Sequence, residues 1–128
     1  MPSYGHPGDA GLDVYALETY TLSPGERKIF FSGFALEFDF GYVAIVKDKS
    51  SLPSFHGLHT MGGVFDAGYR GEYSVQLINL GQEPATLEKG QKIAQLVIFK
   101  IAEAELVEVM ELSESARGEG KMGSTGKF

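Results

Sequence analysis

A Gly-rich segment from Gly62 to Gly71, which we predict to be a hairpin, carries Asp66 and Tyr69, two side chains that could take part in chemistry. A carboxylate among Gly and apolar neighbours can act as a general base that takes a proton from water. However, Asp beside Gly more commonly forms an Asx-turn with its own backbone. Taken alone, the segment allows both interpretations of Asp66.

Two further segments could contact phosphate. The run Asp48-Lys49-Ser50-Ser51 places an ammonium group beside hydroxyls, although it could also be the polar end of a strand. Arg117 to Gly126 holds four Gly, two cations and two hydroxyls, and Gly lets backbone N–H groups close around an anion. Its spacing excludes a Walker P-loop, and a frayed terminus is the alternative interpretation.

Three other polar positions have a structural and a chemical interpretation. Gln95 interrupts an apolar run, and a buried Gln needs partners from a neighbouring strand or from a ligand. Asp13 follows a Gly-Leu pair and, read alone, belongs to a turn. His56 and His59 have the spacing of metal ligands but no nearby third ligand, so we interpret them as loop residues.

Short strands are predicted to position these residues. Gly and Pro recur along the whole chain, and the runs between them either alternate in polarity or are continuously apolar. This pattern is typical of a sandwich or barrel. The predicted strands are Val14 to Leu17, Lys28 to Phe31, Phe34 to Phe38, Tyr42 to Val46, Tyr73 to Asn79 and Ile93 to Phe99.

Three segments differ from this pattern. Ser50 to His56 could form one short helical turn, which Pro53 limits. Ala102 to Glu114 fits a strand or a helix, and we favour a strand because the rest of the chain is β. Arg117 to Phe128 has almost no apolar residues to bury, so we expect it to be mobile in the free protein.

The composition predicts one domain, since the chain has 128 residues of which 43 % are hydrophobic. It has no Cys, no run approaching a membrane span and no signal-peptide pattern in Met1 to Gly5, so we expect a cytoplasmic protein. The net charge of −6 disfavours non-specific nucleic-acid binding. A nucleoside triphosphate would therefore need a local basic cluster and a bridging cation.

Taken in order, the segments resemble the five motifs of the trimeric all-β dUTPases, from Ala10 almost to the C-terminus. Any one motif is a weak signal, but five in order in a chain of this length are specific. The matching residues are Ala10-Gly11-Leu12-Asp13-Val14, Lys49-Ser50-Ser51-Leu52, Gly63 to Gly71, Gly90 to Leu96, and Arg117-Gly118 with Gly123-Ser124-Thr125-Gly126.

The resemblance implies a single domain over residues 1–128, with an all-β, distorted jelly-roll barrel or sandwich at 1–116 and a mobile lid at 117–128. It implies a Mg²⁺-dependent enzyme that cuts dUTP to dUMP and pyrophosphate by in-line attack of water on the α-phosphorus. That reaction limits uracil in DNA and supplies dUMP for dTMP synthesis. The resemblance also implies a homotrimer in which each site draws motifs from all three chains.

The resemblance further implies a role for each matching residue. Asp66 would activate the attacking water, and Tyr69 would lie under the deoxyribose, where a 2′-hydroxyl would not fit. Main-chain groups near Gly63 would pair with the uracil edge, and Asp13 would hold Mg²⁺ through its waters. The other substrate-binding residues would contact the phosphates or close over the nucleotide: Lys49, Ser50, Ser51, Gln95, Arg117, Met122, Gly123 and Ser124.

The chain departs from the family pattern in three places. Lys49 stands where the second motif usually has Arg, and the Lys side chain lacks the bidentate donor that Arg provides. Met122 stands where the fifth motif usually has Phe, so it would cover the uracil less rigidly. Only Met1 to Asp9 precede the first motif, so we expect one sheet edge to be shortened or built differently.

Three alternative functions follow from the same residues. A dCTP deaminase shares the fold and third motif, but Gln76 stands where its catalytic Glu should fall, and Gln cannot transfer the proton. A non-catalytic nucleotide-binding protein would bind dUTP without releasing pyrophosphate. A β-barrel interaction module without a ligand would have no reason to combine Asp66, Tyr69 and the Gly-Ser-Thr-Gly tail.

Overall fold

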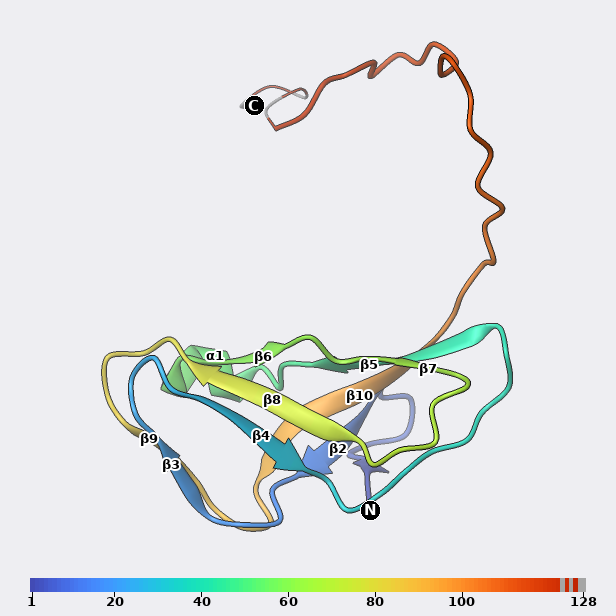
Figure 1. Ribbon diagram of the computed structural model, residues 1–128. Helices are drawn as coiled ribbons and strands as arrows, with labels where there is room; N and C mark the ends of the chain where they lie inside the picture. The colour runs from blue at the N-terminus through green and yellow to red at the C-terminus, as the bar shows by residue number, and fades with distance from the viewer. Residues whose placement is uncertain (123, 125, 127–128) are drawn as a thin grey trace.

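The computed structural model describes residues 1–122, 124 and 126, and its regular structure is almost all strand. The expectation of an all-β fold is therefore confirmed (Figure 1). The elements in chain order are β1 (Ser3–Tyr4), β2 (Gly11–Tyr15), β3 (Tyr20–Leu22), β4 (Arg27–Phe31), β5 (Tyr42–Lys47), α1 (Ser51–His56), β6 (Leu58–Met61), β7 (Val64–Asp66), β8 (Ser74–Asn79), β9 (Ala85–Leu87) and β10 (Lys92–Lys100).

The strands form a distorted jelly roll from three antiparallel sheets. The largest sheet has the order β1-β2-β10-β5-β7, the second has the order β4-β8-β6, and β3 pairs with β9. The core lies between the two larger sheets and takes residues from both, including Val14, Val46 and Leu96 from the first and Phe30 and Leu77 from the second. Burial of these apolar side chains is the main source of the fold's stability.

Alternation along the strands explains which residues enter the core. Along β8, Val75 and Leu77 are buried, whereas Gln76 between them is exposed. Successive side chains of a strand point to opposite faces, so one face of β8 packs inward and the other does not. The predicted alternation of this segment is confirmed.

The predicted strand Phe34 to Phe38 is wrong, although its alternation is correct. Phe34 is buried and Glu37 is exposed, yet the segment is not a strand. The Ser32 N–H donates to the Tyr73 carbonyl (3.1 Å), and the Tyr73 N–H donates to the Phe34 carbonyl (2.9 Å). In the described part of the chain these bonds do not extend into a ladder, which a strand requires.

The segment Ala102 to Glu114 is neither strand nor helix, so the preference for a strand is wrong. It leaves the sheets after β10 and runs away from the body of the chain (Figure 1). Leu106 is 94 % exposed and Val107 is 73 % exposed. Without an apolar surface to cover, the segment gains little from regular structure.

The Gly-rich segment around Asp66 is not the predicted hairpin. The strand before its turn, β7, pairs with β5, whereas the strand after it, β8, pairs with β4 and β6. The turn therefore crosses from one sheet to the other.

The short helix predicted after Ser50 is confirmed as α1. Pro53 lies in its first turn, where an N–H group is not needed for the helix. The edge before the first motif is short, since β1 has two residues and pairs only with β2. Among the described residues, no helix is long and apolar enough to cross a membrane.

Candidate active site

Asp13 on β2 is held by two lysines. Its side chain is buried, Lys49 Nζ lies 2.6 Å from Oδ1, and Lys92 Nζ lies 2.7 Å from Oδ2. Burial alone would raise the pKa of Asp13, but hydrogen bonds from the two ammonium groups and their charges hold the pKa below its ordinary value. Asp13 is thus an ionised carboxylate in a strand, not a turn residue.

Gln95 on β10 lies beside Asp13 in the sheet, because these two residues are register partners. Its Nε2 donates to the Asp48 carbonyl oxygen at 2.8 Å. A Cβ on Gly11 would overlap the Gln95 side chain, so the Gly of the first motif leaves room for it. The segment directly after β5 therefore gives the Gln95 Nε2 a partner within the chain, as one of our two interpretations expected.

Ser50 and Ser51 follow Lys49 directly, at the start of α1. Ser50 occupies the N-cap position, but its hydroxyl makes no capping hydrogen bond. Its side chain is exposed and is free to bind a ligand. We call Asp13, Lys49, Ser50, Ser51 and Gln95 the phosphate-side cluster.

Asp66 ends β7 with its side chain exposed, while the preceding Phe65 packs against the core. The turn that follows is closed by the backbone, since the Tyr69 N–H donates to the Asp66 carbonyl at 3.0 Å. Among the described residues, no hydrogen bond engages the Asp66 carboxylate. The Asx-turn interpretation is therefore wrong, and the carboxylate is available for chemistry.

Gly63 and Tyr69 complete a second cluster with Asp66. We call it the base-side cluster, because its main-chain groups near Gly63 are the ones expected to pair with the nucleobase. Gly63 has a φ of 91°, and a Cβ there would lie 2.8 Å from the Val46 Cβ, so only Gly fits this close approach. The Gly63 carbonyl accepts the Val46 N–H at 2.8 Å. The Tyr69 hydroxyl donates to the Glu72 carbonyl at 3.0 Å, which fixes the ring.

Arg70, which the sequence reasoning missed, braces this turn. Its Nη1 donates to the Ala67 carbonyl at 2.6 Å and to the Tyr69 carbonyl at 3.1 Å, and its Nη2 contacts Glu37 at 3.1 Å. Lys92 was also missed. Each residue lies inside one of the five motifs, Arg70 beside Tyr69 and Lys92 beside Ile93, and its charge was the available signal.

Asp66 and Gln95, one from each cluster, lie apart within one chain. Asp66 is the register partner of Val43, whereas Gln95 is the partner of Lys47, four residues further along β5. Asp66 and Gln95 lie along opposite edges of β5, because β7 and β10 flank it. Strand spacings place the two Cα atoms about 16 Å apart. A single chain therefore does not bring Gln95 beside Asp66.

Comparison with known proteins identifies the family to which these motifs belong. The dUTPase family matches residues 1–126. The chain belongs to the dUTPase family. It is 48 % identical to the deoxyuridine 5′-triphosphate nucleotidohydrolase of Thermobifida fusca, over 98 % of this chain and 72 % of that protein. It is 43 % identical to that of Clostridium kluyveri, over 98 % of this chain and 90 % of that protein.

Solved dUTPase structures share the fold. A mutant dUTPase of Staphylococcus bacteriophage 80alpha with dUpNHpp superimposes with a TM-score of 0.87 at 32 % identity, covering 98 % of this chain and 91 % of that one. A mutant dUTPase from phage phi11 of S. aureus, described for its coordination of a structural Mg(II) ion, gives a TM-score of 0.81 at 27 % identity, covering 89 % and 92 %.

The described residues of the tail motif lie apart from both clusters. Arg117 is exposed, and its Nε donates to the Gly120 carbonyl at 3.0 Å. Met122 and Ser124 are also exposed, and Gly123 lies outside the described residues. In Figure 1 this segment is well separated from the sheets.

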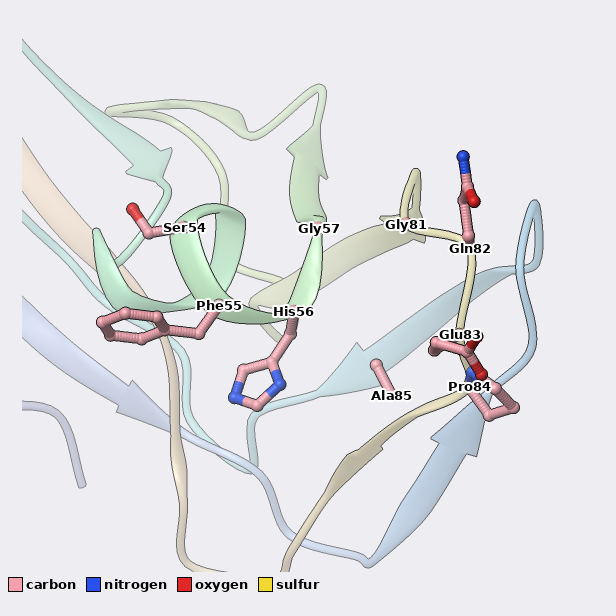
Figure 2. Close-up of a pocket in the computed structure, with 9 residues that line it drawn as sticks. All are labelled: Ser54, Phe55, His56, Gly57, Gly81, Gln82, Glu83, Pro84 and Ala85. Atoms are coloured by element: carbon pink, nitrogen blue, oxygen red, sulfur yellow. The ribbon is translucent and has the colours of Figure 1, made fainter.

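A hollow of about 270 Å³ lies at the end of α1, between that helix and the loop before β9 (Figure 2). Phe55, His56, Glu83 and Pro84 are among its lining residues, and it contains none of the residues of either cluster. The described residues hold no group of three or more His, Asp or Glu side chains that could bind a metal. His59 contacts Asp48 instead, with its Nδ1 2.6 Å from Oδ2.

Proposed function

We propose that the chain hydrolyses dUTP to dUMP and pyrophosphate, with Asp66 orienting and deprotonating the water that attacks the α-phosphorus. One observation carries the assignment of Asp66. It is an exposed carboxylate without a hydrogen-bond partner in the described chain, at the end of a strand and in the turn that the Tyr69 N–H closes. Tyr69 would lie under the deoxyribose, and main-chain groups near Gly63 would pair with uracil. The family and its members' names support the substrate.

The phosphate-side cluster would bind the triphosphate of the same nucleotide. Ser50 and Ser51 offer hydroxyl donors, and Gln95 on β10 binds the carbonyl of Asp48, two residues before Ser50. Lys49 would contribute its charge to the phosphates while remaining the partner of Asp13. Phosphoryl transfer depends mainly on positioning and charge neutralisation, which suits this set of donors.

The active enzyme would be a homotrimer in which neighbouring chains supply the two clusters to one nucleotide, as the resemblance to trimeric dUTPases implies. The separation of about 16 Å between Asp66 and Gln95 supports a site that a second copy completes. The exposed apolar residues after β10, such as Leu106 and Val107, also require a surface to cover. A neighbouring copy would supply that surface and receive the tail.

Mg²⁺ would accompany the triphosphate and neutralise its charge, which the net charge of −6 would otherwise repel. Asp13 is the carboxylate proposed to hold it through waters. The residues present fit an ion held mostly by phosphate oxygens and water, because one carboxylate does not make a protein cage. Lys49 and Lys92 already engage both Asp13 oxygens, so the contact to the hydrated ion would share them.

The tail would act as a lid on this site. Arg117 would bind the γ-phosphate, Met122 would cover the uracil face, and Gly123 and Ser124 would close over the triphosphate. Closure of such a segment excludes water and completes the set of donors. We further propose that residues 1–128 form one domain and that the enzyme works in the cytoplasm.

The test is pyrophosphate release from dUTP, dTTP, dCTP and UTP with Mg²⁺, for the wild type and Asp66→Asn. We expect activity on dUTP alone, and a kcat lower by roughly 10²–10⁴-fold in the variant, the usual contribution of a positioned base. Dissociation constants for a non-hydrolysable dUTP analogue should stay similar in both proteins. Native activity in the variant would contradict the role of Asp66, and ammonia release from dCTP would favour a deaminase.

A further inference from the structure

Tyr69 is the outer end of four aromatic rings in contact, which we call the aromatic column. Its members are Phe34, Tyr73, Phe65 and Tyr69. The ring centroids of Phe34 and Tyr73 lie 5.5 Å apart, those of Tyr73 and Phe65 4.1 Å, and those of Phe65 and Tyr69 5.6 Å. The interplanar angle between Tyr73 and Phe65 is 15°, so these two rings are stacked.

The column runs from the core to the surface. Tyr73 is 1 % exposed, whereas Tyr69 is 41 % exposed. Phe65 packs against the core from β7, and its neighbour Asp66 has an exposed side chain. The partly buried Phe65 ring therefore anchors the strand that carries the proposed base and also supports the ring proposed to meet the sugar.

Gly71 confines Tyr69 from another side. A Cβ at position 71 would overlap the Tyr69 hydroxyl and the adjoining ring carbon, so the ring lies directly over the Gly. The hydroxyl is also bound to the Glu72 carbonyl at 3.0 Å. The Tyr69 ring is thus held by Phe65, by the Tyr73 ring at 5.9 Å between centroids, by Gly71 and by this hydrogen bond.

Rejection of the ribose 2′-hydroxyl requires that the side chain in contact with the sugar stay in a fixed position. A ring that could shift by about 1 Å would make room for a ribose 2′-oxygen, and supporting residues decide whether it can. We infer that Phe65 and Gly71 are specificity-determining positioning residues, which hold the Tyr69 ring where it discriminates deoxyribose from ribose. This inference rests on the proposed function, and neither residue is proposed to touch the nucleotide.

The test compares kcat/KM for dUTP and for UTP in the wild type, Phe65→Ile and Gly71→Ala. Ile keeps an apolar side chain that suits a strand on β7 but removes the ring. We expect the dUTP to UTP ratio to fall about three- to tenfold in each variant, the range that an aromatic contact typically contributes. The near-ultraviolet circular dichroism of the tyrosines should also change, because the environment of the Tyr69 ring changes.

Phe30→Ile is the matched control. Phe30 is 1 % exposed and packs edge-on against Tyr20, with centroids 6.1 Å apart, so it is a core ring outside the aromatic column. Its replacement should lower stability but leave the dUTP to UTP ratio unchanged. An equal fall of the ratio in Phe30→Ile would overturn the inference, because general loosening of the core would then explain the result.

Tyr69→Ala separates this inference from the proposed function. If the wild type does not hydrolyse dUTP, the proposed function fails and the inference falls with it. If Tyr69→Ala lowers the ratio but Phe65→Ile and Gly71→Ala do not, the proposed function stands and the inference is wrong. Should Phe65→Ile fail to fold, Gly71→Ala still decides the question, since it changes a turn and not the core.

Discussion

Asp13 shows how one departure from the family pattern is accommodated at the scale of a residue. Lys49 replaces the usual Arg, and its single ammonium group forms a 2.6 Å ion pair with the buried Asp13. Lys92 pairs with the other oxygen, so neither oxygen of the buried carboxylate lacks a cation. The motif identified Asp13 and Lys49 from the sequence, but their pairing depends on three strands meeting, which no local pattern reports.

Asp48 is expected to make stability depend on pH. Its carboxylate accepts the Thr60 N–H at 2.6 Å and contacts His59 Nδ1 at 2.6 Å. Burial alone would raise the pKa of Asp48, but these hydrogen bonds outweigh burial and hold the pKa below its ordinary value. We expect Asp48→Asn to lower the unfolding free energy by about 1–2 kcal/mol at pH 7.

The sign of the pH effect follows from proton linkage. Because the folded-state pKa is lowered, the unfolded chain binds more protons, and the stabilisation is present above the ordinary Asp pKa of about 3.9. It is lost as the pH falls through the folded-state pKa. In urea unfolding at equal protein concentration, the difference in unfolding free energy between wild type and Asp48→Asn should shrink below about pH 4. The control is Asp39→Asn, at an exposed carboxylate, which should have the same unfolding free energy as the wild type. A difference between wild type and Asp48→Asn that stays the same in acid would contradict the role of the Asp48 carboxylate.

At the scale of elements, the contact between β5 and β7 positions Asp66, and Gly63 makes it possible. We expect Gly63→Ala to cost about 1–3 kcal/mol, because its φ of 91° is unfavourable for Ala and the new methyl would meet Val46. Displacement of β7 should also lower kcat/KM for dUTP. Thermal unfolding and steady-state kinetics measure the two effects.

Gly62→Ala is the matched control for this prediction. Gly62 also has a positive φ, of 64°, but a Cβ there would meet nothing within 4 Å. It should therefore suffer only the backbone strain, about 1 kcal/mol, and keep most of its activity. Equal losses in both variants would show that the contact with Val46 has no separate role.

The sequence pattern predicted the five longest strands, β2, β4, β5, β8 and β10, and its two wrong strand predictions have a common cause. Tyr42 to Val46 and Ile93 to Phe99 became strands because each has neighbours on both sides in the sheet. Phe34 to Phe38 has the correct alternation but no ladder of hydrogen bonds to a neighbouring strand. Ala102 to Glu114 has apolar residues but no surface against which they pack. Sequence shows which face of a segment is apolar, but not whether a partner lies within reach.

At the scale of the whole molecule, the site residues could be predicted but their assembly could not. The motifs identified Asp66 and Gln95, yet the strand order places them on opposite edges of β5. Nothing in the spacing of the motifs along the chain reports that separation. The resemblance to trimeric enzymes supplied the hypothesis of shared sites, and the geometry of one chain now gives it a physical reason.

Shared sites predict that two inactive chains can restore activity together. Asp66→Asn removes the proposed base, whereas Ser50→Glu places a negative charge where the triphosphate should bind, at an exposed N-cap position that tolerates Glu. Each protein alone should be nearly inactive. When equal amounts are unfolded and refolded together, each cluster is intact in half of the chains. About a quarter of the sites should therefore carry both intact clusters and recover native turnover. If each chain built its own site, the mixture would stay as inactive as its parents, and light scattering that shows a monomer would equally contradict shared sites.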